Sequence, residues 1–126
     1  MEKYNVDYFI KKFEAIAEWR WTEGVFTKMI LGFIPTHCAY GHCGHNGSIS
    51  DNPEVIGLLK LDRQLDTTIR LTSVNDGHDY RYQQATPKQR VLAALYDLKK
   101  QQEKKIVYVS VDKEVRELQK KELVLN

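Results

Sequence analysis

The sequence predicts an α+β protein with about four helices and a small sheet, folded as a single compact domain over residues 1–126. Several segments repeat apolar residues at helical spacing behind a residue that can cap a helix. Two other segments, 66–74 and 106–111, are rich in β-branched residues, as strands are. Neither a repeat nor a linker separates these segments, which favours one mixed domain.

Three helices are predicted from their capping signals. Asn5, Asn52 (or its neighbour Asp51) and Thr86 each precede an apolar-periodic segment, and their side chains can accept hydrogen bonds from free N–H groups. Proline follows the second and third cap, at the first helical position, and Gln89 would complete a capping box with Thr86. The expected inner faces are Val6, Phe9, Ile10, Phe13 and Ala17; Val55, Ile56, Leu58 and Leu59; Val91, Leu92, Leu95 and Leu98.

The remaining elements are predicted from residue type. The segment 106–111, I-V-Y-V-S-V, is the clearest strand, and Asp112 would cap a final helix after it. The alternating segment 66–74 is interpreted as a second strand. The segment 25–34 is expected to be a short strand or an irregular covering segment that Pro35 ends.

Composition and charge narrow the classes of function. The chain has 126 residues and a net charge of +2, which does not predict a nucleic-acid partner. No apolar run is long enough for a membrane span, and the N-terminus is too polar for a signal peptide. We therefore expect a cytoplasmic protein with reduced cysteines and no membrane partner.

The segment 36–48, T-H-C-A-Y-G-H-C-G-H-N-G-S, concentrates groups that could carry chemistry. Residues 38–43 are expected to begin a short helix, where the dipole would stabilise a Cys38 thiolate. A cysteine nucleophile would need a histidine and an oriented polar partner. The candidates are Cys38, His42 (or His45 or His78), and Asn75 or Asp76. The alternative is that Cys38 is a small buried apolar residue and that 75–77, N-D-G, only forms a turn.

Zinc is a weaker alternative for the same segment. Zinc sites usually combine two separated ligand pairs in a tetrahedron, and five donors within nine residues are poorly spaced for that. We therefore expect no cofactor. If zinc were bound, its ligands would come from His37, Cys38, His42, Cys43 and His45.

Binding without catalysis is the interpretation that we favour. The loop 75–90 is polar and aromatic, and Lys88 falls in the first turn of a helix, where free N–H groups attract anions. Arginine can bind phosphate through two hydrogen bonds, and tyrosine or tryptophan can stack on a base. The expected ligand-binding residues are Trp21, Asn75, Asp76, Arg81, Tyr82, Lys88 and Arg90.

Two motifs also stand out together: H-C-A-Y-G-H-C-G at 37–44 and N-D-G…Y-Q…T-P-K-Q-R at 75–90. Trp21, Gly24 and Phe26 form a W-x-x-G-x-F element upstream. In combination these motifs resemble a family of small proteins of bacteria and their phages that has no known function, over roughly residues 5–98. Tyr40 departs from that family's pattern, which has leucine there.

The resemblance implies that the motif residues form one constellation: Trp21, Gly24, Cys38, Gly41, Asn75 and Asp76. It implies no activity. Together these observations predict a small accessory binding protein, of phage origin by resemblance, that recognises a nucleotide-type small molecule or a host protein, for example to counter a defence system. The alternative is a hydrolase or transferase centred on Cys38. Homo-oligomerisation is left open.

Overall fold

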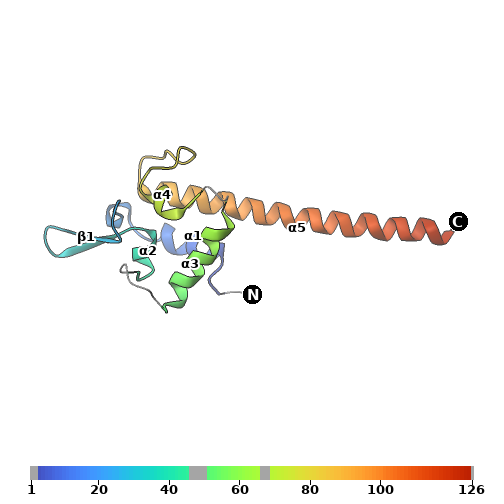
Figure 1. Ribbon diagram of the computed structural model, residues 1–126, viewed down its shortest axis with the longest axis horizontal. Helices are drawn as coiled ribbons and strands as arrows, with labels where there is room; N and C mark the ends of the chain where they lie inside the picture. Colours follow the sequence, from blue (N-terminus) through green and yellow to red (C-terminus); the bar gives the residue numbers. More distant parts are fainter. Residues whose placement is uncertain (1–2, 46–50, 66–68, 126) are drawn as a thin grey trace.

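The computed structural model describes residues 3–45, 51–65 and 69–125; over 106–112 and 119–125 it describes the helix but not the side chains. Within these ranges, a two-stranded antiparallel sheet accompanies six helical elements, and the predicted α+β class is confirmed. Figure 1 shows the helices gathered around one centre, with the hairpin projecting on one side and the last helix on the other.

The first helix, α1 (Val6–Glu14), begins as the sequence predicted. The side chain of Asn5 accepts a hydrogen bond of 2.9 Å from the N–H of Tyr8. Four apolar residues at helical spacing are buried: Val6, Phe9, Ile10 and Phe13. A 3-10 turn, η1 (Glu18–Arg20), then leads to the buried side chain of Trp21.

A hairpin follows, formed by β1 (Thr27–Ile30) and β2 (Ile34–His37). The prediction that Pro35 ends this segment is wrong, because Pro35 lies within β2 opposite Met29. Proline lacks an N–H, but a strand of a two-stranded sheet has an open edge that needs none. Leu31, Gly32 and Phe33 connect the strands. The φ values of Leu31 (53°) and Gly32 (77°) have the sign pattern of a type I′ turn, and the N–H of Phe33 donates to the carbonyl oxygen of Ile30.

The next two helices confirm the sequence interpretation. Cys38 is the N-cap of the short α2 (Ala39–His42). Asn52 caps α3 (Pro53–Gln64) by accepting hydrogen bonds from the N–H groups of Glu54 and Val55.

The strand predicted over 66–74 is wrong where the structure describes it; residues 66–68 lie outside the described part. Leu71 and Val74 instead share the buried face of a helical turn, α4 (Leu71–Asn75). Both ends are held by other elements. Asp62 of α3 accepts the N–H of Leu71 at 3.0 Å, and the Arg90 guanidinium donates to the carbonyl oxygens of Val74 and Asn75.

The last helix, α5 (Pro87–Leu125), is a single helix of 39 residues. The Thr86 hydroxyl accepts the N–H of Gln89 at 3.2 Å, so the predicted cap is confirmed. The strand over 106–111 and the new helix start at Asp112 are wrong, because α5 runs through both. An isolated strand would leave its backbone groups unpaired, whereas a continued helix pairs them internally.

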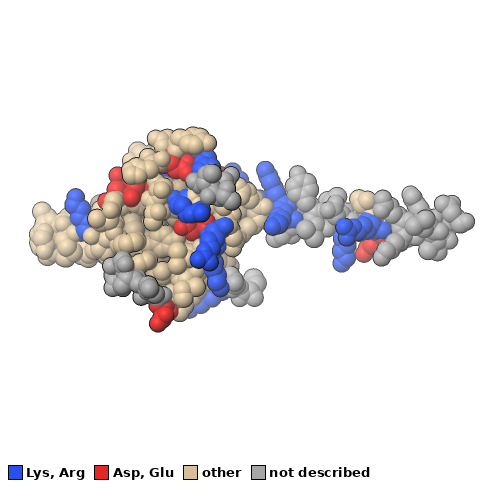
Figure 2. Space-filling view, in the orientation of Figure 1, with Lys and Arg blue, Asp and Glu red and all other residues tan. Residues whose placement is uncertain are grey.

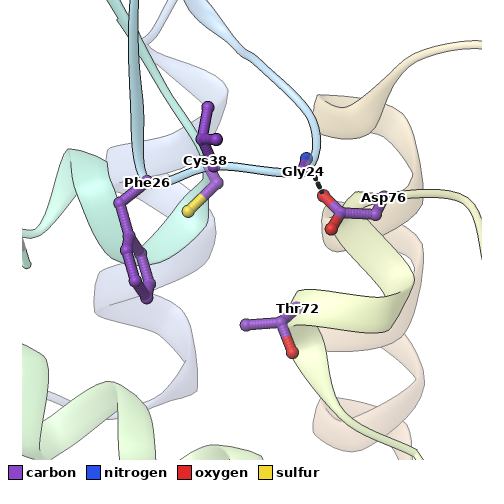
Figure 3. A pocket seen from close by; sticks show the side chains of 6 residues that line it. Gly24, Phe26, Cys38, Thr72 and Asp76 are labelled. Carbon is purple, nitrogen blue, oxygen red and sulfur yellow. Dashed lines mark hydrogen bonds between the residues drawn. The ribbon is translucent and has the colours of Figure 1, made fainter. Parts of the chain in front are cut away.

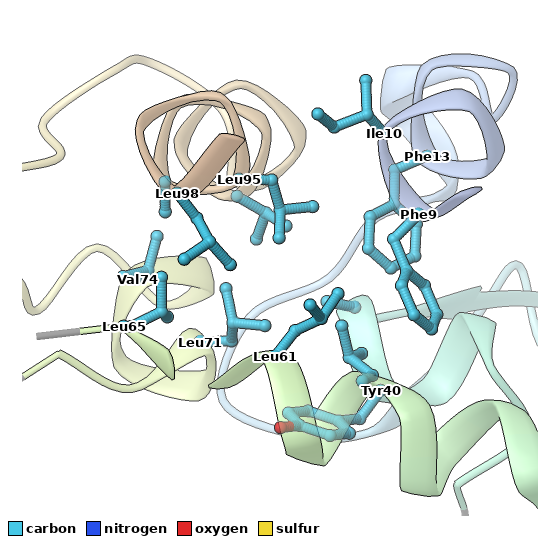
Figure 4. Close-up of a cluster of buried hydrophobic side chains, with 14 of the residues drawn as sticks. Phe9, Ile10, Phe13, Tyr40, Leu61, Leu65, Leu71, Val74, Leu95 and Leu98 are labelled. Atoms are coloured by element: carbon cyan, nitrogen blue, oxygen red, sulfur yellow. The ribbon is translucent and has the colours of Figure 1, made fainter. Parts of the chain in front are cut away.

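The core lies where α1, α3, α4 and the first part of α5 meet (Figure 4). Phe9, Phe13, Leu58, Leu71 and Leu95 are fully buried there. Tyr40 of α2 enters the same cluster, and its hydroxyl donates to the buried Asp62 carboxylate at 2.6 Å. Asp62 therefore receives hydrogen bonds from α2 and α4 at once, which places α2 against the core.

This contact gives a stability prediction. Tyr40→Phe removes the donor to Asp62 Oδ2 in a buried place, so the free energy of unfolding should fall by about 1–3 kcal/mol in urea denaturation. Tyr80→Phe is the matched control because Tyr80 is exposed, and it should change stability by less than about 0.5 kcal/mol. Equal stability of the Tyr40→Phe protein and the wild type would contradict this role of the hydroxyl.

Candidate functional site

The motif residues that lie far apart in the sequence meet at one place. A cavity of about 130 Å³ lies between the hairpin root, the start of α2 and the end of α4. Its lining residues are Gly24, Val25, Phe26, Cys38, Thr72 and Asp76. Figure 3 shows Cys38 and Phe26 on one side of this cavity, with Thr72 and Asp76 facing them from α4 and the turn after it.

Asn75 joins the segments around this site through its side-chain amide. Its Oδ1 accepts the N–H of Ala39 at 3.2 Å, in the first turn of α2. Its Nδ2 donates to the carbonyl oxygen of Thr22 at 2.8 Å and to Asp76 Oδ1 at 3.0 Å. The fully buried Asn75 thus joins α4, α2 and the segment before the hairpin, and its hydrogen-bonding groups are used internally.

Asp76 is oriented by two donors. Its Oδ1 also accepts the N–H of Gly24 at 2.8 Å, which the dashed line in Figure 3 marks. Gly24 has a φ of 78°, a conformation that suits glycine. The carboxylate is half-buried and faces Cys38 across the cavity.

Gly41 lets the motif at 37–44 pack closely against the hairpin root. A Cβ atom at Gly41 would lie 2.0 Å from the carbonyl oxygen of Phe26, so α2 can approach the hairpin root only with glycine here. The N–H of Cys38 donates to that same carbonyl oxygen at 3.1 Å. This close approach brings Cys38 to the cavity wall.

The two cysteines are buried, unpaired thiols. Burial raises the pKa of the Cys38 thiol, although backbone N–H groups of Gly41 and Tyr40 oppose this. Burial also raises the pKa of the Cys43 thiol, and the charge of Glu54 adds to the effect. Both thiols are therefore protonated at neutral pH, a state with little nucleophilicity.

The histidines lie among aromatic rings. His42 lies 4.7 Å from Trp21 and 5.1 Å from His37, centroid to centroid, while His45 stacks on Phe26 at 4.4 Å. His42 Nε2 and Trp21 Nε1 are buried atoms that form no hydrogen bond with any residue in the described part of the chain. Among the described residues, which include all five proposed zinc ligands, no three of the His, Cys, Asp and Glu side chains are placed to hold a metal ion.

The predicted anion-binding residues are largely engaged within the protein. Arg90 is buried, and its guanidinium donates to three backbone carbonyl oxygens and pairs with Glu23. Lys88 donates to the carbonyl oxygen of Glu14 at 2.9 Å. Arg81 pairs with Asp79 through two hydrogen bonds.

The predicted aromatic groups are also engaged internally. Tyr82 is buried, and its hydroxyl donates to Asp97; burial and this carboxylate raise the pKa of Tyr82 to about 12. Trp21 is buried against Phe13 and His42. A second, larger cavity of about 320 Å³ lies elsewhere, between Tyr4 and α3, and none of the motif residues is among those lining it.

Sequence reasoning missed an exposed apolar cluster at the end of the hairpin, which we call the hairpin tip: Met29, Leu31 and Phe33. Their exposed fractions are 51%, 81% and 70%. Figure 2 shows the projecting end without charged atoms. The signal was Gly32 in the middle of an apolar run, which marks a turn and so places its neighbours at a tip.

Comparison with protein families, with curated proteins and with solved structures gives no match for this chain. Across residues 3–45, 51–65 and 69–125, no helix has both the length and the apolar character that crossing a membrane requires.

The role of Asn75 can be tested by removing its amide. Asn75→Ala leaves the buried N–H of Ala39 and carbonyl of Thr22 without a partner, at about 1–3 kcal/mol for each group. We expect the free energy of unfolding to fall by about 2–5 kcal/mol. Ser73→Ala, on the exposed side of α4, is the control and should be nearly neutral. A similar small change in both variants would show that the amide does not join the three segments.

His42 gives a pH prediction. Burial, with a smaller effect of His37 and Arg20, lowers the pKa of His42 from 6.5 to about 4. As the pH drops below 6.5, His42 is therefore protonated in the unfolded chain but stays neutral in the folded protein. The free energy of unfolding should fall as the pH drops from 6.5 towards 4. In denaturation series across this range, His42→Gln should lose less stability than the wild type. His78 is exposed, so the control variant His78→Gln should lose as much stability across this pH range as the wild type does. If His42→Gln also loses as much stability as the wild type, the burial of a neutral His42 is refuted.

Proposed function

We propose that this protein is a small accessory binding protein that recognises another protein through its hairpin tip. The observation that carries the proposal is the exposure of Met29, Leu31 and Phe33 together at the end of a projecting hairpin. Contiguous exposed apolar surface on a folded protein is typical of interaction sites. An isolated two-stranded hairpin is also only marginally stable in water, and a bound partner would stabilise it.

The backbone at Leu31 supports this proposal. A side chain other than glycine in the left-handed region costs roughly 1–2 kcal/mol, and asparagine is tolerated far better than leucine. Leu31 has a φ of 53° and is also the most exposed residue of the tip. Neither the folding of the turn nor contact with the core explains a leucine here, whereas binding does.

The charge of the hairpin indicates what the partner surface should be like. Between Val25 and His37 the sequence contains Lys28 and no acidic residue. The hairpin root is fixed by hydrogen bonds, including those from the N–H of Thr22 to His37 and from the Thr36 hydroxyl to Lys28. We therefore expect an apolar pocket bordered by acidic residues on the partner, contacted by a tip that extends from a rigid base.

The other two expected functions have less support. The cavity that motif residues line, about 130 Å³, is small for a nucleotide, since ligand pockets usually measure roughly 300–1,000 Å³. The larger cavity of about 320 Å³ is lined by none of the residues expected to bind a nucleotide. Arg90 and Lys88, expected to hold phosphate, are engaged with internal acceptors. A hydrolase or transferase centred on Cys38 would need a thiolate, and burial of Cys38 favours the neutral thiol.

The resemblance to phage proteins indicates where the proposed binding would take place. A phage protein acts in the host cytoplasm, so the partner would be a host protein, for example a component of a defence system. This part rests on the motifs alone, and the hairpin proposal does not depend on it.

The experiment that tests the proposal places a photo-crosslinking residue, p-benzoylphenylalanine, at position 33 and, as a control, at the exposed position 80. We expect a bacterial protein to be captured from position 33 only. Binding of the purified partner should then weaken about 30-fold or more in Phe33→Glu, as for an interface hot spot. Unchanged affinity of Phe33→Glu for every captured protein would reject the proposal.

Leu31→Asn separates binding from folding. Asparagine tolerates the positive φ and creates an Asn-Gly turn with Gly32, so the free energy of unfolding should rise by about 0.5–1 kcal/mol. The same change removes an apolar contact of the tip, so affinity for the partner should fall about tenfold. We therefore expect Leu31→Asn to raise the free energy of unfolding measured in urea and to lower the affinity measured by calorimetry. A variant that gains stability and keeps its affinity would show that Leu31 does not contact the partner.

A further inference from the structure

We propose that the cavity at the hairpin root binds a primary ammonium group, with Asp76 as its counter-ion and Phe26 as its aromatic wall. This inference concerns a second site and does not rest on the hairpin tip. Its ligand class is a small alkylamine, which presents one positive charge on a short apolar chain.

The carboxylate of Asp76 is already oriented for such a ligand. Oδ1 accepts hydrogen bonds from the N–H of Gly24 and from Nδ2 of Asn75, which fixes the plane of the group. Among the described residues nothing donates to Oδ2. An ammonium group at Oδ2 would complete a charge-assisted hydrogen bond without any rearrangement of the carboxylate.

The remaining walls suit the apolar part of an amine. Phe26 and Cys38 lie opposite Asp76, and Thr72 lies beside it on α4 (Figure 3). His45 stacks on one face of the Phe26 ring, so the ligand would contact the remaining surface of the ring. Methylene groups can pack there, and an aromatic ring also attracts a nearby cation. Asp76 is the charged residue among those lining the cavity.

The guanidinium of Arg90, which lies against the turn after Asp76, pairs with other groups. Arg90 lies behind the turn, against Gly77, where its guanidinium donates to backbone carbonyls and pairs with Glu23. None of these acceptor residues is among those that line the cavity. The residues that line the cavity therefore include no positive group to pair with the Asp76 carboxylate.

The size of the cavity limits the ligand. Its volume of about 130 Å³ is close to the ~150 Å³ of an apolar protein cavity that holds benzene. n-Butylammonium, with a four-carbon chain, matches this volume. We therefore use it as the probe, with n-butanol as its neutral analogue and butyrate as its anionic analogue.

The experiment follows the amide signals of the full-length protein by two-dimensional NMR during titration at constant ionic strength. n-Butylammonium should shift the amides of Gly24 and Ala39 in a saturable way, while n-butanol and butyrate should bind at least tenfold more weakly. Added salt should weaken the binding of the amine, because it screens a partly exposed ion pair.

Asp76→Asn is the decisive variant, since its amide oxygen can still accept from Gly24 while the charge is lost. Its affinity for n-butylammonium should fall about tenfold or more, as expected for loss of a charged hydrogen bond. Asp51→Asn removes the same charge from an exposed position elsewhere and should bind as the wild type does.

A second readout uses the wild-type protein alone, so that it does not depend on the folding of a variant. Bound amine should slow the alkylation of Cys38 by iodoacetamide, followed at alkaline pH because the buried thiol is protonated at neutral pH. The alkylation is measured by mass spectrometry on the peptide that contains Cys38. The inference is overturned if no saturable shift occurs, if butanol binds as tightly as the amine, or if Asp76→Asn keeps the wild-type affinity. None of these outcomes bears on Leu31 or Phe33, so failure here leaves the hairpin proposal intact.

Discussion

The rest of the structure depends on the buried amide of Asn75. α4 has five residues and α2 has four, and helices this short are not stable alone. The Asn75 amide joins them to each other and to the carbonyl of Thr22, in a fully buried place where an unmade hydrogen bond is costly. Asp62 and Arg90 hold the two ends of α4 in the same manner. Polar side chains therefore fix the positions of α2 and α4, and apolar side chains pack between the elements so placed.

The sequence predicted the elements whose signals are local. The helices capped by Asn5, Asn52 and Thr86 are present, and each cap is made by the expected side chain. Both predicted strands failed for a reason that lies outside their own residues. α4 is helical because Asp62 and Arg90 pair its end groups. Residues 106–111 are helical because they continue a capped helix, and among the described residues the one sheet is the hairpin of β1 and β2. β-branched residues favour strands, but contacts with the rest of the protein can override this preference.

Part of the constellation that the motifs implied lies together in the structure. Cys38, Asn75 and Asp76 meet as the motifs implied. Residue types could not reveal that Arg90 and Tyr82 are engaged in internal hydrogen bonds. Their partners include carbonyl oxygens at the end of α4 and the carboxylate of Asp97, which lie 15 or 16 residues away in the sequence. The hairpin tip was not predicted because its residue types suggested the wrong environment. Apolar residues in a run suggest burial, and only the turn at Gly32 places them in solvent.

The length of α5 determines what spectroscopic probes of this protein will report. Its first turns pack against α1 and α4, whereas the later part projects away from the globular body (Figure 1). Far-ultraviolet circular dichroism weights every helical residue equally, so a large share of the signal comes from helix that contributes little to the core. Fraying of that part on heating would produce a broad, early loss of ellipticity. In tryptophan fluorescence, the change on unfolding would come mainly from the buried Trp21, because Trp19 is already exposed in the folded protein. That change would follow the core, so the two melting curves would separate within a protein whose core unfolds cooperatively.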